Sequence, residues 1–120
     1  MNPAIKYLYN SLVDISTKEY EHLSYGFFPF KRKYTVIHPY IKNKAAKILT
    51  YFHEHYKNSY DALDEDDKLK VKTMINALIE IRDAEVISLP YGLFDTLERC
   101  YVADTVDVAS RTIRKIKRYI

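Results

Sequence analysis

Residues that form tight turns are scarce in this 120-residue chain, which has two glycines and four prolines. A β-rich fold needs a turn every ~8–12 residues, and a phosphate-binding loop needs several clustered glycines. Hydrophobic residues make up 48% of the chain and charged residues 29%, which is enough apolar material for one buried core. The sequence therefore predicts an all-α fold, with a single helical domain over residues 1–120 and no internal repeat.

Apolar residues at spacings of three and four predict a small bundle of three long helices plus one or two short N-terminal helices. Pro3 opens a first helix, and Ser16 to Glu19 matches the capping box of a short second one. We expect a loop or a short extended stretch over residues 24–37. The long helices are expected over residues 39–57, 65–88 and 93–118, with Asp64 as the N-cap of the second.

A single cysteine, Cys100, excludes a disulfide framework and suits a reducing compartment. No apolar run approaches the ~18 residues of a membrane span, and the N-terminal segment lacks the apolar core of a signal peptide. These features predict a soluble cytoplasmic protein.

Catalytic and metal-binding patterns are not found in the sequence. His53 and His55 diverge on a helix and cannot share one metal ion, and the acidic residues from Asp61 to Asp67 fit a helix start better than a calcium loop. We therefore expect no catalytic residues, no metal site, no cofactor and no enzymatic activity.

Charge is segregated along the chain. Residues 27–60 carry seven cations against Glu54, a local +6; residues 61–110 carry five cations and twelve acids, a local −7; and the last ten residues carry five cations and no acid. Basic segments can neutralise nucleic-acid phosphates or steer docking with an acidic protein partner. Solvated surface and helix-dipole compensation explain the C-terminal cluster equally well. Aromatic residues surround the run from Lys31 to Lys33, and they can stack on bases or anchor a loop to the core. The candidate residues for binding nucleic acid or an acidic partner are Lys31, Arg32, Lys33, Lys42, Lys44, Lys47, Arg111, Arg114, Lys115, Lys117 and Arg118.

The helix expected over residues 65–88 has a wide apolar arc, which suggests contacts on more than one side. Twelve tyrosines and no tryptophan add rigid amphipathic side chains that suit either an interface or the edge of a small core. The arc tips the balance towards an interface. The candidate subunit-interface residues are Ile75, Leu78, Ile79, Ile81, Arg82 and Val86.

The pattern Leu78-x-x-Ile81-Arg82-x-x-x-Val86-Ile87-x-Leu89 resembles the central helix of GINS subunits, especially the archaeal one. The residues Phe94, Asp95, Leu97, Glu98 and Tyr101 are similar to the helix that follows in that family. GINS subunits usually also carry a small β domain, for which this chain has no room. The resemblance implies a non-catalytic scaffold of the replicative helicase in DNA replication, whose partners would be other subunits, the MCM helicase and a RecJ-like protein.

Two functions are therefore expected. The first is a non-catalytic assembly subunit in nucleic-acid metabolism, within a hetero- or homo-oligomer and away from membranes. The alternative is a small basic helical protein that binds nucleic acid directly, similar in kind to a CRISPR effector small subunit or an archaeal viral coat or DNA-binding protein. Steep salt dependence would distinguish phosphate binding from apolar assembly.

Overall fold

The computed structural model describes residues 2–25, 32–90, 98–103 and 105–117. Helices and strands alternate along this part of the chain. In order they are α1 (Pro3–Ser16), β1 (Glu21–Tyr25), β2 (Arg32–Ile37), α2 (Tyr40–His55), α3 (Lys57–Asp61), α4 (Glu65–Arg82), β3 (Val86–Pro90), β4 (Glu98–Ala103) and α5 (Thr105–Lys117).

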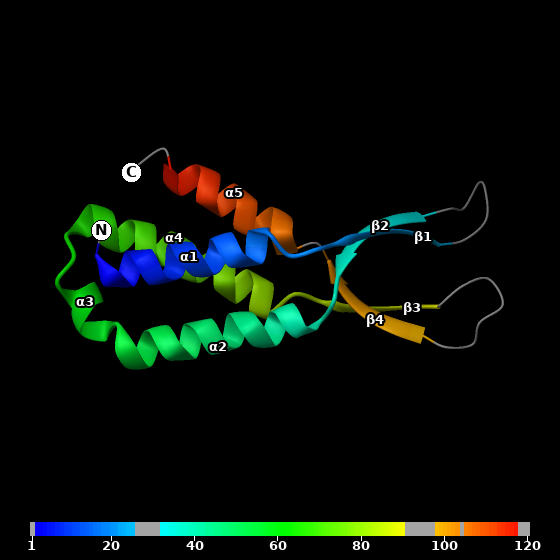
Figure 1. Cartoon of the computed structure of the whole chain (residues 1–120), viewed down its shortest axis with the longest axis horizontal. Helices are drawn as coiled ribbons and strands as arrows, with labels where there is room; N and C mark the ends of the chain where they lie inside the picture. The colour runs from blue at the N-terminus through cyan, green and yellow to red at the C-terminus, as the bar shows by residue number, and fades with distance from the viewer. Residues whose placement is uncertain (1, 26–31, 91–97, 104, 118–120) are drawn as a thin grey trace.

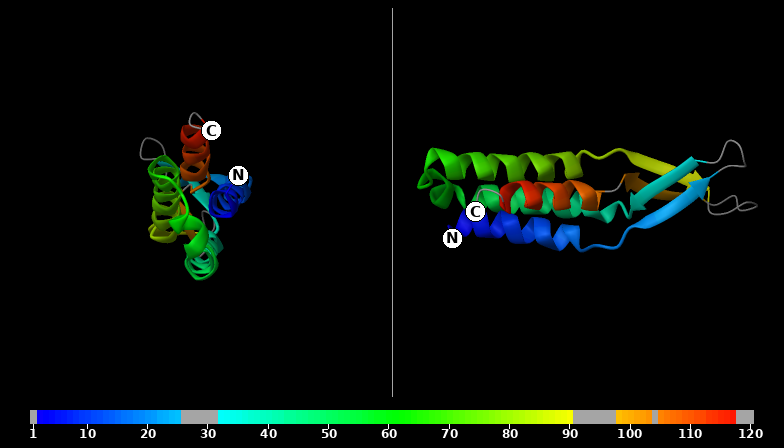
Figure 2. Two further views of the ribbon diagram at one scale, coloured as in Figure 1. Left: turned by 90° about the vertical axis from the view of Figure 1, so that its left-hand side faces the viewer. Right: turned by 90° about the horizontal axis from the view of Figure 1, so that it is seen from above.

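The molecule consists of a helical body and a two-hairpin arm that projects from one end of it (Figure 1). In the body, α1 and α4 lie on opposite broad faces, while α2 and α5 lie along opposite edges (Figure 2). The resulting shape is elongated, with extents of 57 × 28 × 18 Å. The helical bundle expected from the sequence is confirmed for the body, which holds most of the described residues.

The helices begin where the sequence supplies caps. The Asn2 side chain accepts a hydrogen bond of 2.8 Å from the Ala4 amide, and Pro3 occupies the first helical turn. The Asp64 side chain accepts one of 2.8 Å from the Asp67 amide, which confirms Asp64 as the N-cap of α4. Both caps satisfy amides that the helix itself leaves without partners.

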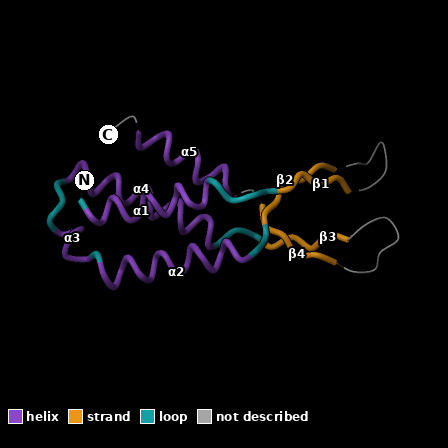
Figure 3. The backbone as a smooth tube through the Cα atoms, in the orientation of Figure 1, coloured by secondary structure: helices purple, strands orange, loops and turns teal. Residues whose placement is uncertain are grey.

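The arm is an antiparallel sheet with strand order β1-β2-β4-β3. The two hairpins meet only at their bases, where Val36 pairs with Ala103 and Ile37 with Val102. Beyond that junction the hairpins continue as separate two-stranded ribbons (Figure 3). The strands β1 and β3 form the two edges of the sheet.

The sheet shows that the all-α prediction is incomplete. The expected capping-box helix after Ser16 is wrong, because residues 21–25 pair with β2 as a strand. The helix expected to reach Ser88 ends at Arg82, and the helix expected over 93–118 begins only at Thr105. The β-branched Val86 and Ile87, and Tyr101 with Val102, favour strands once cross-strand partners are available.

The residues that carry the GINS resemblance do not all lie on helices. The pattern from Leu78 to Leu89 crosses from α4 into β3 instead of lying on one helix. In the segment expected to be the following helix, Glu98 and Tyr101 lie on β4, whereas Phe94, Asp95 and Leu97 lie outside the described residues.

The chain contains an internal repeat, so the expectation of none is wrong. Residues 3–55 and residues 65–117 each run helix, strand, strand, helix, and the palindromic sheet order places the two copies around a pseudo-twofold axis. When the chain is aligned with itself at one constant spacing, four buried residues of α1 fall opposite four buried residues of α4. These pairs are Ile5 and Val71, Leu8 and Met74, Leu12 and Leu78, and Ile15 and Ile81.

The core is built mainly between the two halves. The second helix of each half packs most closely on the first helix of the other, α2 on α4 and α5 on α1. Apolar side chains from all four long helices meet there, together with Ile37 and Val102 from the base of the arm. Neither half could bury its apolar faces without the other, so the two halves form one cooperative unit.

Candidate binding surfaces

The arm has two edge strands, β1 and β3, and its first hairpin contains Arg32 and Lys33 of the basic segment. Backbone register places Arg32 opposite Tyr25 and Lys33 opposite Ser24, on the hairpin of β1 and β2. Lys31 lies outside the described residues. An edge strand presents unpaired amides and carbonyls to any chain that aligns with it, so the arm has the backbone chemistry of a docking element.

Polar and aromatic side chains line the base of this hairpin. His22 is exposed, and its Nδ1 lies 3.0 Å from Oγ1 of Thr35 on the adjacent strand. The His22 ring also meets the half-exposed Tyr20 ring edge-on, with centroids 5.3 Å apart. This places an aromatic and a titratable ring at the outer edge of the sheet.

The lysines predicted on α2 have different roles. Lys42 Nζ donates to the Ala84 carbonyl just beyond the end of α4, and Lys44 forms an ion pair with Asp14 of α1. Lys47 is exposed and makes no ion pair with any described residue. Two of the three lysines therefore join helices within the molecule.

The cations of α5 lie on the opposite edge of the body from those of α2 (Figure 2). Arg111 Nε pairs with Asp107 at 2.9 Å, whereas Arg114 and Lys115 are exposed and make no ion pair within the described part of the chain. The Lys117 side chain and Arg118 lie outside the description. The described cations of α2 and α5 therefore belong to helices on opposite edges of the body.

The predicted interface residues divide by burial. Leu78 and Ile81 are 0% exposed, so in this structure their side chains pack inside the chain's own core. Ile75 and Ile79 are half-buried. The wide apolar arc exists because α4 contacts both α2 and α1, as well as α5.

The remaining two interface candidates lie near the end of α4. Arg82 pairs with the adjacent Asp83 at 2.9 Å, which lowers the pKa of that carboxyl. Val86 is 46% exposed on the edge strand β3. Of the six predicted residues, Val86 is the apolar one that reaches an open edge.

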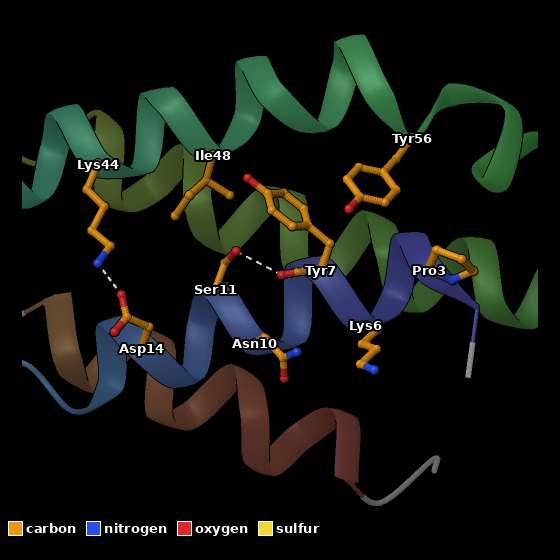
Figure 4. Close-up of a pocket in the computed structure, with 9 residues that line it drawn as sticks. All are labelled: Pro3, Lys6, Tyr7, Asn10, Ser11, Asp14, Lys44, Ile48 and Tyr56. Atoms are coloured by element: carbon orange, nitrogen blue, oxygen red, sulfur yellow. Dashed lines mark hydrogen bonds and ion pairs between the residues drawn. The ribbon is translucent and has the colours of Figure 1, made fainter.

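A groove of about 460 Å³ separates α1 from α2 (Figure 4). Because α2 packs chiefly on α4, the two helices of the first half stand apart and leave this space. The Tyr7 ring stacks on the Tyr56 ring, with centroids 4.8 Å apart and planes at 17°, and bridges the gap. Burial raises the pKa of Tyr7, and the neighbouring Tyr56 and Tyr51 add to the effect.

An ion-pair cluster closes the other end of this groove. The Asp14 carboxylate contacts Lys44, and its second oxygen lies 3.7 Å from Lys18 Nζ. The hydrogen bond from Lys44 lowers the pKa of Asp14, and the same bond raises the pKa of Lys44. The side chains remain 31% and 48% exposed, so solvent screens the pair.

A second groove of about 300 Å³ lies between α4 and α5, at the equivalent place in the other half. Asn76 and Glu80 line it where Asn10 and Asp14 line the first. Arg111 and Lys115 supply cations from α5. The repeat therefore gives the molecule two grooves that are lined by equivalent residues of α1 and α4.

Metal and membrane features were also sought. Among the residues that the structure describes, no three His, Cys, Asp or Glu side chains gather closely enough to hold a metal ion. None of the described helices combines the length and hydropathy needed to traverse a bilayer.

The sequence contains one signal for the two-hairpin arm that composition and periodicity did not reveal, namely the internal repeat. Tyr25-Gly26 and Tyr91-Gly92 recur at the spacing of the repeat, with Phe28 and Phe94 two positions later. Aligning the chain with itself at this spacing would have predicted two equivalent hairpins, and hence the arm. The structure of both turn segments lies outside the described residues.

The fold and its surfaces define a tandem helix–hairpin–helix protein with a projecting arm. No protein-family model matches the chain, and no curated protein or solved structure matches it either.

Proposed function

We propose that this chain is a non-catalytic assembly subunit in nucleic-acid metabolism, and that its two-hairpin arm docks a partner. The observation that supports this most is the arm itself, which extends beyond the body with both edge strands open. An isolated two-stranded ribbon is marginally stable in water, so two such ribbons gain most from a surface that covers them. A GINS-like scaffold is one form of this proposal, but the proposal rests on the arm and not on that resemblance.

The charge of the first hairpin supports a partner that carries negative charge. Arg32 and Lys33 follow Lys31 in sequence, and over residues 21–37 only Glu21 opposes these three cations. A basic hairpin accelerates association with an acidic protein or with nucleic acid.

Direct binding of nucleic acid is the second candidate, and Arg114 and Lys115 favour it. Both are exposed on α5 and make no ion pair within the described residues. Phosphate binding through such residues would lose affinity steeply as salt increases, whereas docking through strand edges and apolar side chains would not.

Photo-crosslinking tests the proposal on the full-length chain. A crosslinking amino acid in place of the exposed His22 on β1 should capture a defined protein of nucleic-acid metabolism in the source cells. The same group in place of the exposed Thr50 on α2 is the control and should not capture it. Equal labelling from both positions would contradict docking through the arm, and crosslinks mainly to nucleic acid would favour the second candidate.

A charge variant separates the two candidates. Arg32→Glu with Lys33→Glu should weaken capture of the protein partner from His22. Arg114→Glu with Lys115→Glu should leave that capture unchanged but abolish any salt-dependent binding of DNA measured by fluorescence anisotropy. If neither pair changes either measurement, both candidate functions lose their support.

A further inference from the structure

Each half of the molecule carries one row of exposed positions along its first helix. We name the α1 stripe (Lys6, Asn10 and Asp14) and the α4 stripe (Lys72, Asn76 and Glu80). Their members are four residues apart, so each stripe follows one side of its helix. At the spacing of the repeat the two stripes match residue for residue.

The stripes are retained where neighbouring positions have changed. The lysine and the asparagine are identical in both halves, and the carboxylate is kept as Asp14 or Glu80. The half-buried positions beside them differ, for example Tyr7 against Thr73 and Tyr9 against Ile75. Exposed positions usually tolerate substitution. Asp14 already has ion-pair partners within the chain, so it is the retained lysine and asparagine that indicate a contact outside the chain.

Helix stability does not explain the asparagines. Asn is a poor helix former because its amide competes for backbone hydrogen bonds, and Asn10 and Asn76 both lie inside helices. Neither side chain makes a hydrogen bond within the described residues. Lys6 and Asn10 are exposed and line the groove that Figure 4 shows between α1 and α2.

The order of charge along a stripe makes it complementary to itself. From N- to C-terminus each stripe runs cation, amide, anion. If two stripes meet antiparallel, each lysine faces a carboxylate and the asparagines face one another at the centre. We propose that the partner of this surface is a second copy of the chain, bound stripe against stripe, with the α4 stripes forming the principal contact.

The order of charge in the stripes determines how the two copies are oriented. The helix α4 lies on one broad face of the body, and α1 lies on the opposite face (Figure 2). Parallel stripes would place lysine on lysine and carboxylate on carboxylate, so the two copies must run in opposite directions. Their arms then project from opposite ends, and both remain open for the partner proposed above.

The α4 stripe is the stronger candidate for the contact between copies, because its carboxylate is available to pair with a lysine of the second copy. Glu80 makes no ion pair within the described residues, whereas Asp14 is already paired with Lys44 and Lys18. Exposed ion pairs are individually weak and are screened by salt, so the association should be modest and sensitive to ionic strength.

Sedimentation velocity of the full-length chain over a concentration series, at low and moderate ionic strength, tests this proposal. The native chain should dimerise at low ionic strength. Lys72→Glu converts both facing pairs into repulsive ones and should weaken dimerisation about tenfold or more. Lys72→Glu combined with Glu80→Lys reverses the stripe but keeps it self-complementary, so dimerisation should return to near the native level.

Lys47→Glu on α2 is the matched control, since it changes the same charge at an exposed position outside both stripes. It should leave dimerisation within about twofold of native, and circular dichroism should show that every variant keeps its helices. A native chain that stays monomeric at low ionic strength would overturn the proposal. So would equal effects of Lys72→Glu and Lys47→Glu, or a folded double variant that fails to recover. The arm variants address the proposed function alone, so the two ideas can fail separately.

Discussion

Leu12 and Leu78 occupy the same fully buried position in the two halves of the chain, one on α1 and the other on α4. They lie where the first helices of the two halves come together, so both side chains belong to the shared core. The pair shows how the repeat works: each half supplies an equivalent helix, and the apolar sides of both helices are buried in the shared core.

Leu12→Ala and Leu78→Ala should therefore destabilise the protein to a similar extent. Removing a fully buried leucine side chain costs about 2–5 kcal/mol of unfolding free energy through lost burial and a residual cavity. Urea denaturation followed by circular dichroism measures this loss. If Leu78 belonged to a subunit interface instead, Leu78→Ala would lower the oligomeric mass and leave the unfolding of the dilute monomer unchanged.

The sequence could predict helices and caps because those signals are local. Asn2, Pro3 and Asp64 begin helices through atoms within a few residues, and periodic apolar positions identify the buried side of α2. The arm depends on pairing between distant residues, such as Val36 with Ala103. No local pattern contains that information, so residues 86–88 were expected to continue a helix.

The same limit applies to the apolar arc of α4. An apolar arc around α4 shows that the helix is covered on several sides, but it does not show whether the cover comes from the same chain. The structure supplies that cover from α1, α2 and α5. The repeat was a second non-local signal, and only comparing the chain with itself would have revealed it.

The Asp14–Lys44 pair should make a small, acid-sensitive contribution to stability. The folded pKa of Asp14 is lowered, so this contribution is present above the unfolded value of 3.8 and is lost as pH falls through the folded pKa. Because the pair is partly exposed, a double-mutant cycle of Asp14→Asn and Lys44→Met should give a coupling of about 0.2–1 kcal/mol at pH 7. The coupling should vanish well below pH 3.8, and a coupling that does not depend on pH would show that packing alone joins these residues.

The ionisation of Tyr7 should lower the stability of the folded protein at alkaline pH. Its folded pKa is raised above the ordinary value of 10.0, so its contribution is complete below pH 10.0 and declines as pH rises further. Tyr7→Phe keeps the ring against Tyr56 but removes the ionisable hydroxyl. The variant should lose less stability than the native chain between neutral and strongly alkaline pH in thermal melts. An identical alkaline loss in both proteins would assign the effect to other tyrosines.

The Asp64 cap should be important to α4 and, through it, to the whole core. Asp64→Ala removes the acceptor for the Asp67 amide and should cost about 0.5–2 kcal/mol of unfolding free energy, measured in urea. Asp64→Asn is the control, because it keeps an oxygen acceptor at the N-cap and should retain most of the native stability. Equal losses in the two variants would attribute the effect to charge near the helix start.

Asn10→Ala and Asn76→Ala should each stabilise the monomer slightly. Both residues are exposed inside helices, where alanine is favoured over asparagine by up to about 0.7 kcal/mol. Thermal melts in dilute solution should therefore show a small rise in melting temperature.

Asn76→Ala should at the same time weaken dimerisation at low ionic strength, because the amide at the centre of the antiparallel pair is lost. Thr50→Ala, at an exposed position of α2 outside the stripes, should leave dimerisation unchanged. Opposite effects of one substitution on folding and on association would show that Asn76 is retained for contact between copies. A fall in monomer stability after Asn76→Ala would instead assign the asparagine a structural role within α4.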